Sequence, residues 1–389
     1  MEGTLPNARE RLLTSLRGSS AVIPDIQRVL HQYPFKVHPQ VERLEEDVHK
    51  ELEMTFRDPK DEKRLWKMKS ARFSFLCASW WPYSSYECLR VMTHLVLWLF
   101  YWDDELDSSE FSSIIYDEAS STKFREETIS YIEASLSRQT DCDLAQISTN
   151  PLIVNLNQIL PAVQRDYSAS EQLPSRFFRS TYIITSTNSS SSLNNQLTDQ
   201  IEALLHELRR YVRMTREEQM SQIENRITSA EGYIRRRMGT SAVCVILALH
   251  EYALGIELPR DVMQSSSMQT IWHETNMIVS IMNDMLSLKK EVDLCHVDTL
   301  VPILFLEHGS LQTAIDRVIS MVQSSMKRLD CAEKELLRCY ASSATLTRDL
   351  QLFIRNCKHT CTGNLNWTLQ SKRYNLNVDS TSGAVHITL

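Results

Sequence analysis

The chain has few of the residues that make tight turns. Its 389 residues include only 8 glycines and 11 prolines, well below the average usage of about 7% and about 5%. Hydrophobic residues make up 42% and charged residues 23%, which is typical of a globular protein. No part of the chain shows an internal repeat or a convincing alternation of strand type. These absences favour a protein built mostly of helices.

Three further absences limit the possible partners and the compartment. The net charge of −7 and the pI near 5.9 give no support for a nucleic-acid partner. The longest apolar run, 89–102, is too short to span a bilayer and contains Arg90 and His94, so we expect no stable membrane insertion. The amino terminus lacks a signal-peptide pattern, and the nine cysteines include no CxxC pair. We therefore expect a cytoplasmic protein with reduced thiols.

The helical patterns predict one all-α domain over residues 21–374. Residues 1–20 are predicted to be a flexible amino terminus, and residues 375–389 a flexible carboxyl-terminal tail. The segment 185–199 is rich in Ser and Asn and has little to bury, which predicts a mobile loop or insertion.

Three aspartates and a glutamate end one of the most apolar stretches of the chain, in the segment "DDELD" from Asp103 to Asp107. On a helix, positions i and i+4 share a face, so Asp103 and Asp107 can reach one target, whereas Asp104 lies about 100° round the helix. Clustered acids repel each other unless a cation neutralises them, and carboxylates are ligands of Mg²⁺. The pattern predicts a divalent-cation site; taken alone, it also fits a solvated acidic helix end.

A second polar face ends another apolar helix, near residues 271–286. Asn283, Ser287 and Glu291 are spaced four apart, and each step of four drifts only about 40° round a helix, so their oxygens line one face over roughly 12 Å. An amide, a hydroxyl and a carboxylate suit a single Mg²⁺. Lys290 adds a positive charge close by. Taken alone, a polar face that pairs with neighbouring helices explains the spacing equally well.

Two groups of cationic residues can bind an anion. Arg235–Arg237 precede an apolar helix, and only one or two of these consecutive residues can face a given site. Near the carboxyl end, Trp367 is followed by Arg373 and Tyr374. Arginine can bind phosphate oxygens with two hydrogen bonds, tyrosine can donate one, and a tryptophan face attracts cations. A solvated basic patch and ordinary packing are the alternatives for each group alone. Together, the four features predict a diphosphate held by several Mg²⁺ ions.

In this order the four features resemble the motifs of the single-domain class I terpene synthases of fungi and bacteria, most closely a fungal sesquiterpene synthase. Asp103–Asp107 matches DDxxD, and Asn283–Glu291 matches the family's Asn-Ser-Glu triad, NDxxSxxxE. Arg237 fits the diphosphate-sensing arginine best, with Arg236 as the second choice. The carboxyl-terminal pattern is present as Trp367, Ser371, Arg373 and Tyr374. The resemblance covers about residues 75–374.

The resemblance also predicts a helix break after the sensing arginine, at Thr240 and Ser241. The family usually has a small residue just after this arginine, and here Gly239 and Ser241 compete for that place. The resemblance implies an α-helical bundle around a central apolar pocket, and a monomer or a homodimer.

The implied reaction is the Mg²⁺-dependent ionisation and cyclisation of a linear prenyl diphosphate, farnesyl diphosphate in the first place. Three Mg²⁺ ions are expected with the diphosphate, and Mn²⁺ is a possible substitute. The implied metal ligands are Asp103, Asp107, Asn283, Ser287 and Glu291, with Asp104 in support. The implied diphosphate contacts are Arg237, Lys290, Arg373 and Tyr374. The aromatic residues expected to stabilise a carbocation are Phe100 and Trp367. Phe75, Trp80 and Trp272 are weaker candidates that fit plain core packing better.

Other functions fit parts of the pattern. A diterpene synthase would take geranylgeranyl diphosphate instead. A chain-elongating prenyl diphosphate synthase usually carries a second aspartate-rich motif, where this chain has Asn283, Ser287 and Glu291. A non-catalytic helical ligand-binding protein is the alternative from another class. An EF-hand calcium protein is excluded because its glycine-bearing loop pattern is missing.

Overall fold

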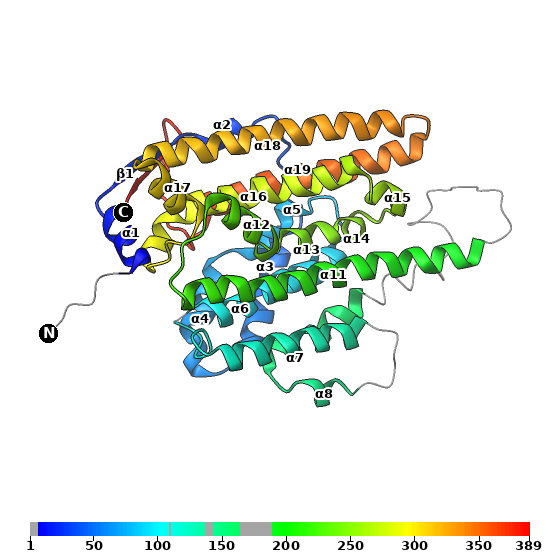
Figure 1. Cartoon of the computed structure of the whole chain (residues 1–389). Coiled ribbons are helices and arrows are strands. Elements are labelled where there is room, and N and C mark those ends of the chain that lie inside the picture. Colours follow the sequence, from blue (N-terminus) through cyan, green and yellow to red (C-terminus); the bar gives the residue numbers. More distant parts are fainter. Residues whose placement is uncertain (1–6, 109, 137–142, 164–188) are drawn as a thin grey trace.

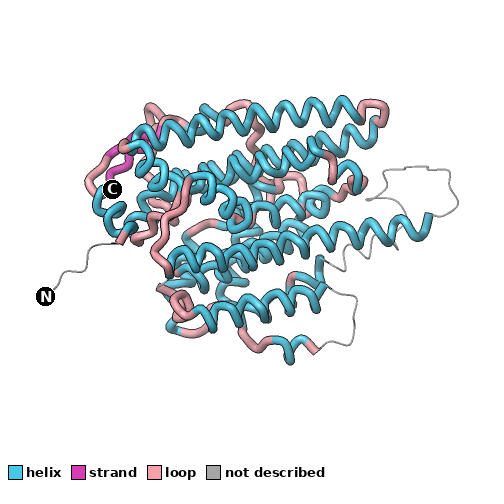
Figure 2. Tube along the Cα trace, viewed as in Figure 1, coloured by secondary structure: helices cyan, strands magenta, loops and turns pink. Residues whose placement is uncertain are grey.

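Helices make up nearly all of the regular structure (Figures 1 and 2). The computed structural model describes residues 7–108, 110–136, 143–163 and 189–389. Within these residues the long helices are α6 (Tyr86–Asp107), α11 (Ser189–Ile223), α16 (Ser266–Asp293), α18 (Leu311–Cys339) and α19 (Ala344–Gln370). The shorter ones are α1 (Ala8–Leu16), α2 (Ile26–Val29), α3 (Val41–Thr55), η1 (Pro59–Asp61), α4 (Glu62–Ser70), α5 (Phe73–Trp80), α7 (Glu118–Leu136), α8 (Leu144–Ile147), α9 (Pro151–Val154), η2 (Asn155–Gln158), α12 (Ala230–Thr240), α13 (Val243–Ala248), α14 (His250–Leu254), α15 (Arg260–Met263) and α17 (Leu300–His308). The predicted all-α class is confirmed.

The helices that carry the two acidic motifs both begin at serine caps. Ser85 accepts a hydrogen bond from the backbone N–H of Cys88 at the start of α6, and Ser265 does the same for α16. Such caps satisfy amides that the first helical turn leaves without partners. Because α6 ends at Asp107, its acids occupy the last turn, at the negative end of the helix dipole. Helix formation alone therefore does not favour acids at this position.

Two short strands far apart in the sequence pair with each other. Strand β1 (Ser20–Ile23) pairs antiparallel with β2 (Val385–Thr388), and Figure 1 shows both beside α1 and α18. Helix α1 is anchored by Leu12 and Leu16, which are buried. The predictions of a flexible amino terminus over 1–20 and a flexible tail over 375–389 are therefore wrong for these elements, and residues 1–6 lie outside the described residues. They failed because the pairing joins segments far apart in the sequence, which local patterns do not reveal.

The predicted loop over 185–199 is also wrong where the structure describes it. Residues 189–199 form the amino-terminal part of α11, which continues without interruption to Ile223. Residues 185–188 lie outside the described residues. The Ser- and Asn-rich composition disfavours a helix locally, but this segment is continuous with an amphipathic helix that packs against α7, α12 and α13.

Buried apolar side chains form two clusters. One gathers residues of α16, α17, α18 and α19, together with α1 and the two strands. The other gathers residues of α3, α5, α6, α7, α11 and the α13–α14 segment. The two acidic motifs therefore lie on helices that belong to different clusters. None of the described helices has the length and apolarity needed to cross a membrane, and the eight cysteines among the described residues form no disulfide.

Candidate active site

The acids of α6 point in two directions. The hydroxyl of Tyr211, on α11, donates a hydrogen bond to Asp103 Oδ1 at 2.8 Å. Asp104 Oδ1 lies 4.0 Å from Arg373 Nη2. Glu105, in contrast, pairs with Arg64 at 3.4 Å. The motif therefore directs Asp103 toward α11 and Asp104 toward the carboxyl-terminal Arg373, whereas Glu105 turns to Arg64 on α4.

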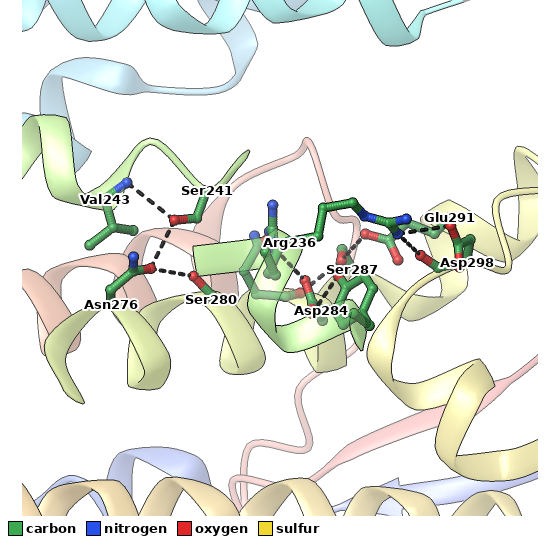
Figure 3. Close-up of polar contacts among 12 residues, drawn as sticks. Arg236, Ser241, Val243, Asn276, Ser280, Asp284, Ser287, Glu291 and Asp298 are labelled. Atoms are coloured by element: carbon green, nitrogen blue, oxygen red, sulfur yellow. Dashed lines mark hydrogen bonds and ion pairs between the residues drawn. The ribbon is translucent and has the colours of Figure 1, made fainter. Parts of the chain in front are cut away.

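The Asn-Ser-Glu triad lines one face of α16, as its spacing predicts. Figure 3 shows two of its members, Ser287 and Glu291. The Ser287 hydroxyl lies within hydrogen-bonding distance of the Asn283 carbonyl, at 2.7 Å, and of Glu291 Oε1. The second carboxylate oxygen of Glu291, Oε2, is buried without a hydrogen-bond partner among the described residues. A buried acceptor in this state is costly unless a cation or donor reaches it.

Among the three consecutive arginines, Arg237 is the one that reaches the triad. Its Nη2 donates to Asn283 Oδ1 at 3.0 Å, and its Nε donates to Asp284 Oδ1 at 3.0 Å. Tyr233 donates to the other oxygen of Asp284 at 2.7 Å. Arg236 is instead paired with Asp298 at 2.8 Å. The geometry thus supports Arg237 over Arg236 as the residue that faces the site.

Arg235 extends away from this network. It is exposed and pairs with Glu231 on its own helix. It therefore fits the interpretation of a solvated basic residue that the sequence left open.

The helix break after Arg237 is present. Helix α12 ends at Thr240, Ser241 caps it, and Ala242 adopts a left-handed conformation with φ 58° before α13 begins. Gly239 has a separate role, because a Cβ there would lie 2.5 Å from Met214 Cγ on α11. A small residue at 239 is thus required for the close approach of α12 and α11, whereas Ser241 lies in the break itself.

Two residues near the carboxyl end, Arg373 and Tyr374, lie next to members of both motifs. Asn283 Nδ2 donates to the hydroxyl of Tyr374 at 3.0 Å. The positive charge of Arg373, followed by burial, lowers the pKa of Lys290 to about 8. Asp104 and Asp107 oppose this shift. The two cations Arg373 and Lys290 therefore lie close together and near the acids of α6.

The two main predicted carbocation-stabilising aromatics, Phe100 and Trp367, lie close to each other, and Phe100 lies beside Arg373. The Arg373 guanidinium carbon is 5.3 Å from the ring centre of Phe100, which is 6.0 Å from the ring of Trp367. Phe73, which the sequence did not single out, lies 4.4 Å from Phe100. Phe75 lies apart from this group, next to Phe35 and Arg72, both exposed. Its place on α5, two residues from Phe73, turns it to a different side of the helix.

The weaker candidates have other surroundings. Trp80 packs edge-on against Trp81, and Trp272 is partly buried against both apolar clusters. Two surface hollows, one including Met277 and Arg317 and the other Ile234 and Leu304, are lined by none of the predicted site residues. The central pocket therefore stays a prediction.

The electrostatics of the acids show a shortage of positive charge. Burial, with the negative charge of Glu218 next in importance, raises the pKa of Asp103 to about 7. Burial and the neighbouring Asp103 raise the pKa of Asp107 well above its usual range. Burial likewise raises the pKa of Glu291 to about 7. Asp103 and Asp107 lie close together without enough cationic partners, and the hard oxygen donors of all three carboxyls suit a divalent cation.

The acids do not form a complete metal site by themselves. Among the described residues, no three His, Cys, Asp or Glu side chains converge on a point suited to a metal ion. Any metal bound here would need oxygens from other groups, such as Asn283, Ser287 or a ligand.

Four residues near the site were missed by the sequence analysis: Phe73, Tyr211, Glu218 and Tyr233. Tyr211 and Glu218 belong to the charged helix α11, which resembles a surface helix in its composition. Tyr233 precedes Arg237 by one helical turn and shares its partner Asp284. A tyrosine four residues before a buried arginine was a usable signal for Tyr233, but no local pattern marked the other three.

Comparisons with known proteins identify the family of the chain. A family model described as terpene synthase family 2, C-terminal metal binding, matches residues 94–328. Sesquiterpene cyclase hepA of Aspergillus oryzae is 27% identical over 382 residues, covering 96% of this chain and 94% of its own. Terpene cyclase braA of Annulohypoxylon truncatum is 26% identical over 368 residues, covering 94% and 89%.

Solved structures show the same fold. A hedycaryol synthase in complex with HEPES matches with a TM-score of 0.64 at 16% identity, covering 86% of this chain and 95% of that one. The SVS_A2 protein from ancestral sequence reconstruction matches with a TM-score of 0.67 at 16% identity, covering 90% and 91%.

A helical bundle that carries an aspartate-rich helix end and an Asn-Ser-Glu face defines a class I terpene synthase. The family model spans more than half of the chain, and the chain belongs to terpene synthase family 2. It is a terpene synthase of the fungal type, from a family that binds divalent metal.

Proposed function

We propose that this protein converts farnesyl diphosphate into a cyclic sesquiterpene hydrocarbon or alcohol, releasing diphosphate in a Mg²⁺-dependent reaction. The observation that carries the proposal is the facing arrangement of under-neutralised acids on α6 and the Asn-Ser-Glu face of α16, with Arg237, Lys290, Arg373 and Tyr374 near them. The names of the relatives, a sesquiterpene cyclase among them, favour the C15 substrate.

The chain's own residues fit the metal and the leaving group. Asp103 and Asp107 would hold Mg²⁺ on one side, supported by Asp104, and Asn283, Ser287 and Glu291 would hold it on the other. The unpartnered Oε2 of Glu291 and the shortage of cations around Asp107 support this assignment. Three bound Mg²⁺ ions, for which Mn²⁺ can substitute, would neutralise the diphosphate and make it a better leaving group.

The cationic side chains would orient the diphosphate. Arg237 offers two N–H donors from one guanidinium, and these now bind Asn283 and Asp284. Arg373 and Lys290 lie on the side of the α6 acids. Substrate binding would therefore exchange hydrogen bonds between protein groups for bonds to phosphate oxygens. The faces of Phe100 and Trp367 would stabilise the developing carbocation.

The direct test is turnover with three substrates. Purified protein with Mg²⁺ is incubated separately with geranyl, farnesyl and geranylgeranyl diphosphate, and extracts are analysed by gas chromatography–mass spectrometry. We expect a cyclic C15 product from farnesyl diphosphate. In the Asn283→Ala variant, checked for folding by circular dichroism, the rate should fall by about 100-fold or more, equivalent to about 3 kcal/mol.

Each other outcome would replace the proposal. A cyclic product only from geranylgeranyl diphosphate would make the protein a diterpene synthase. Longer diphosphates, formed only when isopentenyl diphosphate is added, would make it a chain-elongating synthase. No turnover by folded protein with Mg²⁺ or Mn²⁺ would indicate a non-catalytic helical ligand-binding protein.

A further inference from the structure

A buried amide on α16 reaches the helix break that follows Arg237. Asn276 precedes Asn283 by seven residues, or nearly two helical turns, so it lies on the same face about 10 Å away along the axis. Its side chain is 1% exposed. Neither the sequence motifs nor the proposed reaction gives this residue a role.

Asn276 bonds to both halves of the break. Its Nδ2 donates to the carbonyl of Met238 in the last turn of α12 at 3.0 Å. Its Oδ1 accepts hydrogen bonds from Ser241 and Ser280, each at 2.8 Å. Ser241 Oγ in turn accepts the N–H of Val243, the first residue of α13, at 3.3 Å. Figure 3 shows this chain of contacts from Asn276 through Ser241 to Val243.

These contacts replace helical hydrogen bonds at the break. In a continuous helix, Val243 N–H would bind the carbonyl four residues earlier, but here it binds a side chain. The left-handed Ala242 costs energy for a residue with a Cβ, of the order of 1 kcal/mol, and persists only if its surroundings hold it. Asn276 is the group that links the end of α12, the break and α16 in one network.

The network also lies one helical turn from the proposed diphosphate contact. Arg237 and Ser241 are four residues apart, and the backbone N–H of Ser241 donates to the Arg237 carbonyl at 3.1 Å. A change in the shape of the break therefore changes the position of groups next to Arg237 without removing any of the proposed diphosphate contacts.

We propose that Asn276 is a positioning residue that fixes the shape of the helix break and thereby determines which product the enzyme forms. This inference rests on the proposed function, because it concerns the course of that reaction after diphosphate leaves. A role limited to stability would lower the melting temperature without changing the product ratio.

The test compares Asn276→Ala with Thr275→Val. Thr275 lies in the same turn of α16 and is buried, but its hydroxyl donates within the helix, to Ile271 at 2.7 Å. Each variant is measured for diphosphate release, for product ratio by gas chromatography–mass spectrometry, and for hydrogen–deuterium exchange of the amides in residues 241–245. If Asn276→Ala does not fold, Ser241→Ala is measured instead, because it removes the hydrogen bond between Ser241 and Asn276 while keeping Asn276.

For Asn276→Ala we expect diphosphate release within about threefold of wild type, a main-product fraction at least halved, and amide exchange in 241–245 at least tenfold faster. Thr275→Val should change none of these. Unchanged product ratio and exchange in folded Asn276→Ala would overturn the proposal, and so would an equal shift in Thr275→Val.

The exchange measurement does not depend on turnover. If wild-type protein converts no prenyl diphosphate, the proposed function fails and product control by Asn276 fails with it. The exchange rates would then still decide whether Asn276 holds the break.

Discussion

The two acidic motifs of this enzyme are balanced in different ways. On α16, Asp284 is paired with Arg237 and Tyr233, and Asn283 is bonded to Arg237 and Tyr374. On α6, Asp103 has the neutral hydroxyl of Tyr211 as its direct partner, and burial raises its pKa to about 7. Asp284 is held by a cation of the protein, Arg237, whereas the direct hydrogen-bond partner of Asp103 carries no charge. The comparison shows two ways in which a buried carboxylate can be held before a ligand binds. It can be paired with a cation of the protein, as Asp284 is, or left without one, as Asp103 is.

The largest expected effect is the loss of stability when Arg237, the cation paired with Asp284 on α16, is removed. Arg237→Ala leaves Asp284, which is 1% exposed, as a buried charge without its arginine. Breaking such a pair costs about 3 kcal/mol in the free energy of unfolding. Urea denaturation of the metal-free protein measures this loss. Arg235→Ala is the matched control, because Arg235 is exposed and should change stability by less than about 0.5 kcal/mol.

A double-mutant cycle identifies the cause of that loss. Asp284→Asn removes the charge that Arg237 neutralises, so the double variant should lose less stability than the sum of the two single variants, by about 1 kcal/mol or more. Simple additivity would mean that the pair does not organise α16, and the contrast between the motifs would disappear.

The second-largest expected effect is a loss of stability in acid that is caused by His250, a residue outside both motifs. His250 is buried, accepts a hydrogen bond from Trp81 at 3.3 Å and contacts Thr360 at 3.3 Å; burial lowers its pKa to about 3. Because the unfolded pKa is about 6.5, the unfolded chain binds a proton first as the pH falls, and stability is lost from about pH 6.5 downwards. At pH 5 the loss is about 2 kcal/mol from this residue.

Urea midpoints at pH 7.5 and pH 5 measure this effect for wild type and His250→Gln. The variant should be less sensitive to acid than wild type, even if it is less stable at both values. An equal loss in both proteins would show that other groups govern the acid limit.

The smallest expected effect is a gain in stability when a charge on α6 is removed. Asp103→Asn keeps an acceptor for Tyr211 but removes one negative charge from the neighbourhood of Asp104, Asp107 and Glu218. Without metal, in EDTA at pH 8, this should raise the free energy of unfolding by about 1 kcal/mol. The variant should also lose most of the thermal stabilisation that Mg²⁺ with inorganic diphosphate gives to wild type.

Glu105→Gln is the control for this prediction, since Glu105 is in the same motif but already pairs with Arg64. It should not gain stability. If Asp103→Asn loses as much stability as Glu105→Gln, then the charge of Asp103 is neutralised by the protein, as that of Asp284 is, and the contrast between α6 and α16 is wrong.

The sequence predicted the parts of the site that depend on helical spacing. Asp103 with Asp107, and Asn283 with Ser287 and Glu291, follow from steps of four on helices whose apolar runs are long enough to be identified. Tyr211 and Glu218 could not be found in this way, because their role depends on how α11 crosses α6. The side of α5 that Phe75 occupies is likewise set by packing, which a local pattern does not reveal.

The same limit explains the errors in the fold. The predictions of loose ends assumed that a segment with little local pattern has no partner. Here β1 and β2 are partners to each other, with Ser20 opposite Thr388. The identity of a strand's partner is a property of the whole chain.

This pairing has a consequence for the order in which the protein folds. The hydroxyls of Ser20 and Thr388 make a hydrogen bond across 368 positions of sequence. During synthesis β1 leaves the ribosome before its partner, which is made only after α19, so the sheet cannot close until residues 385–388 are available. Contacts of such sequence separation are slow to form. The amino-terminal strand should therefore stay exposed to proteases on nascent chains and become protected last.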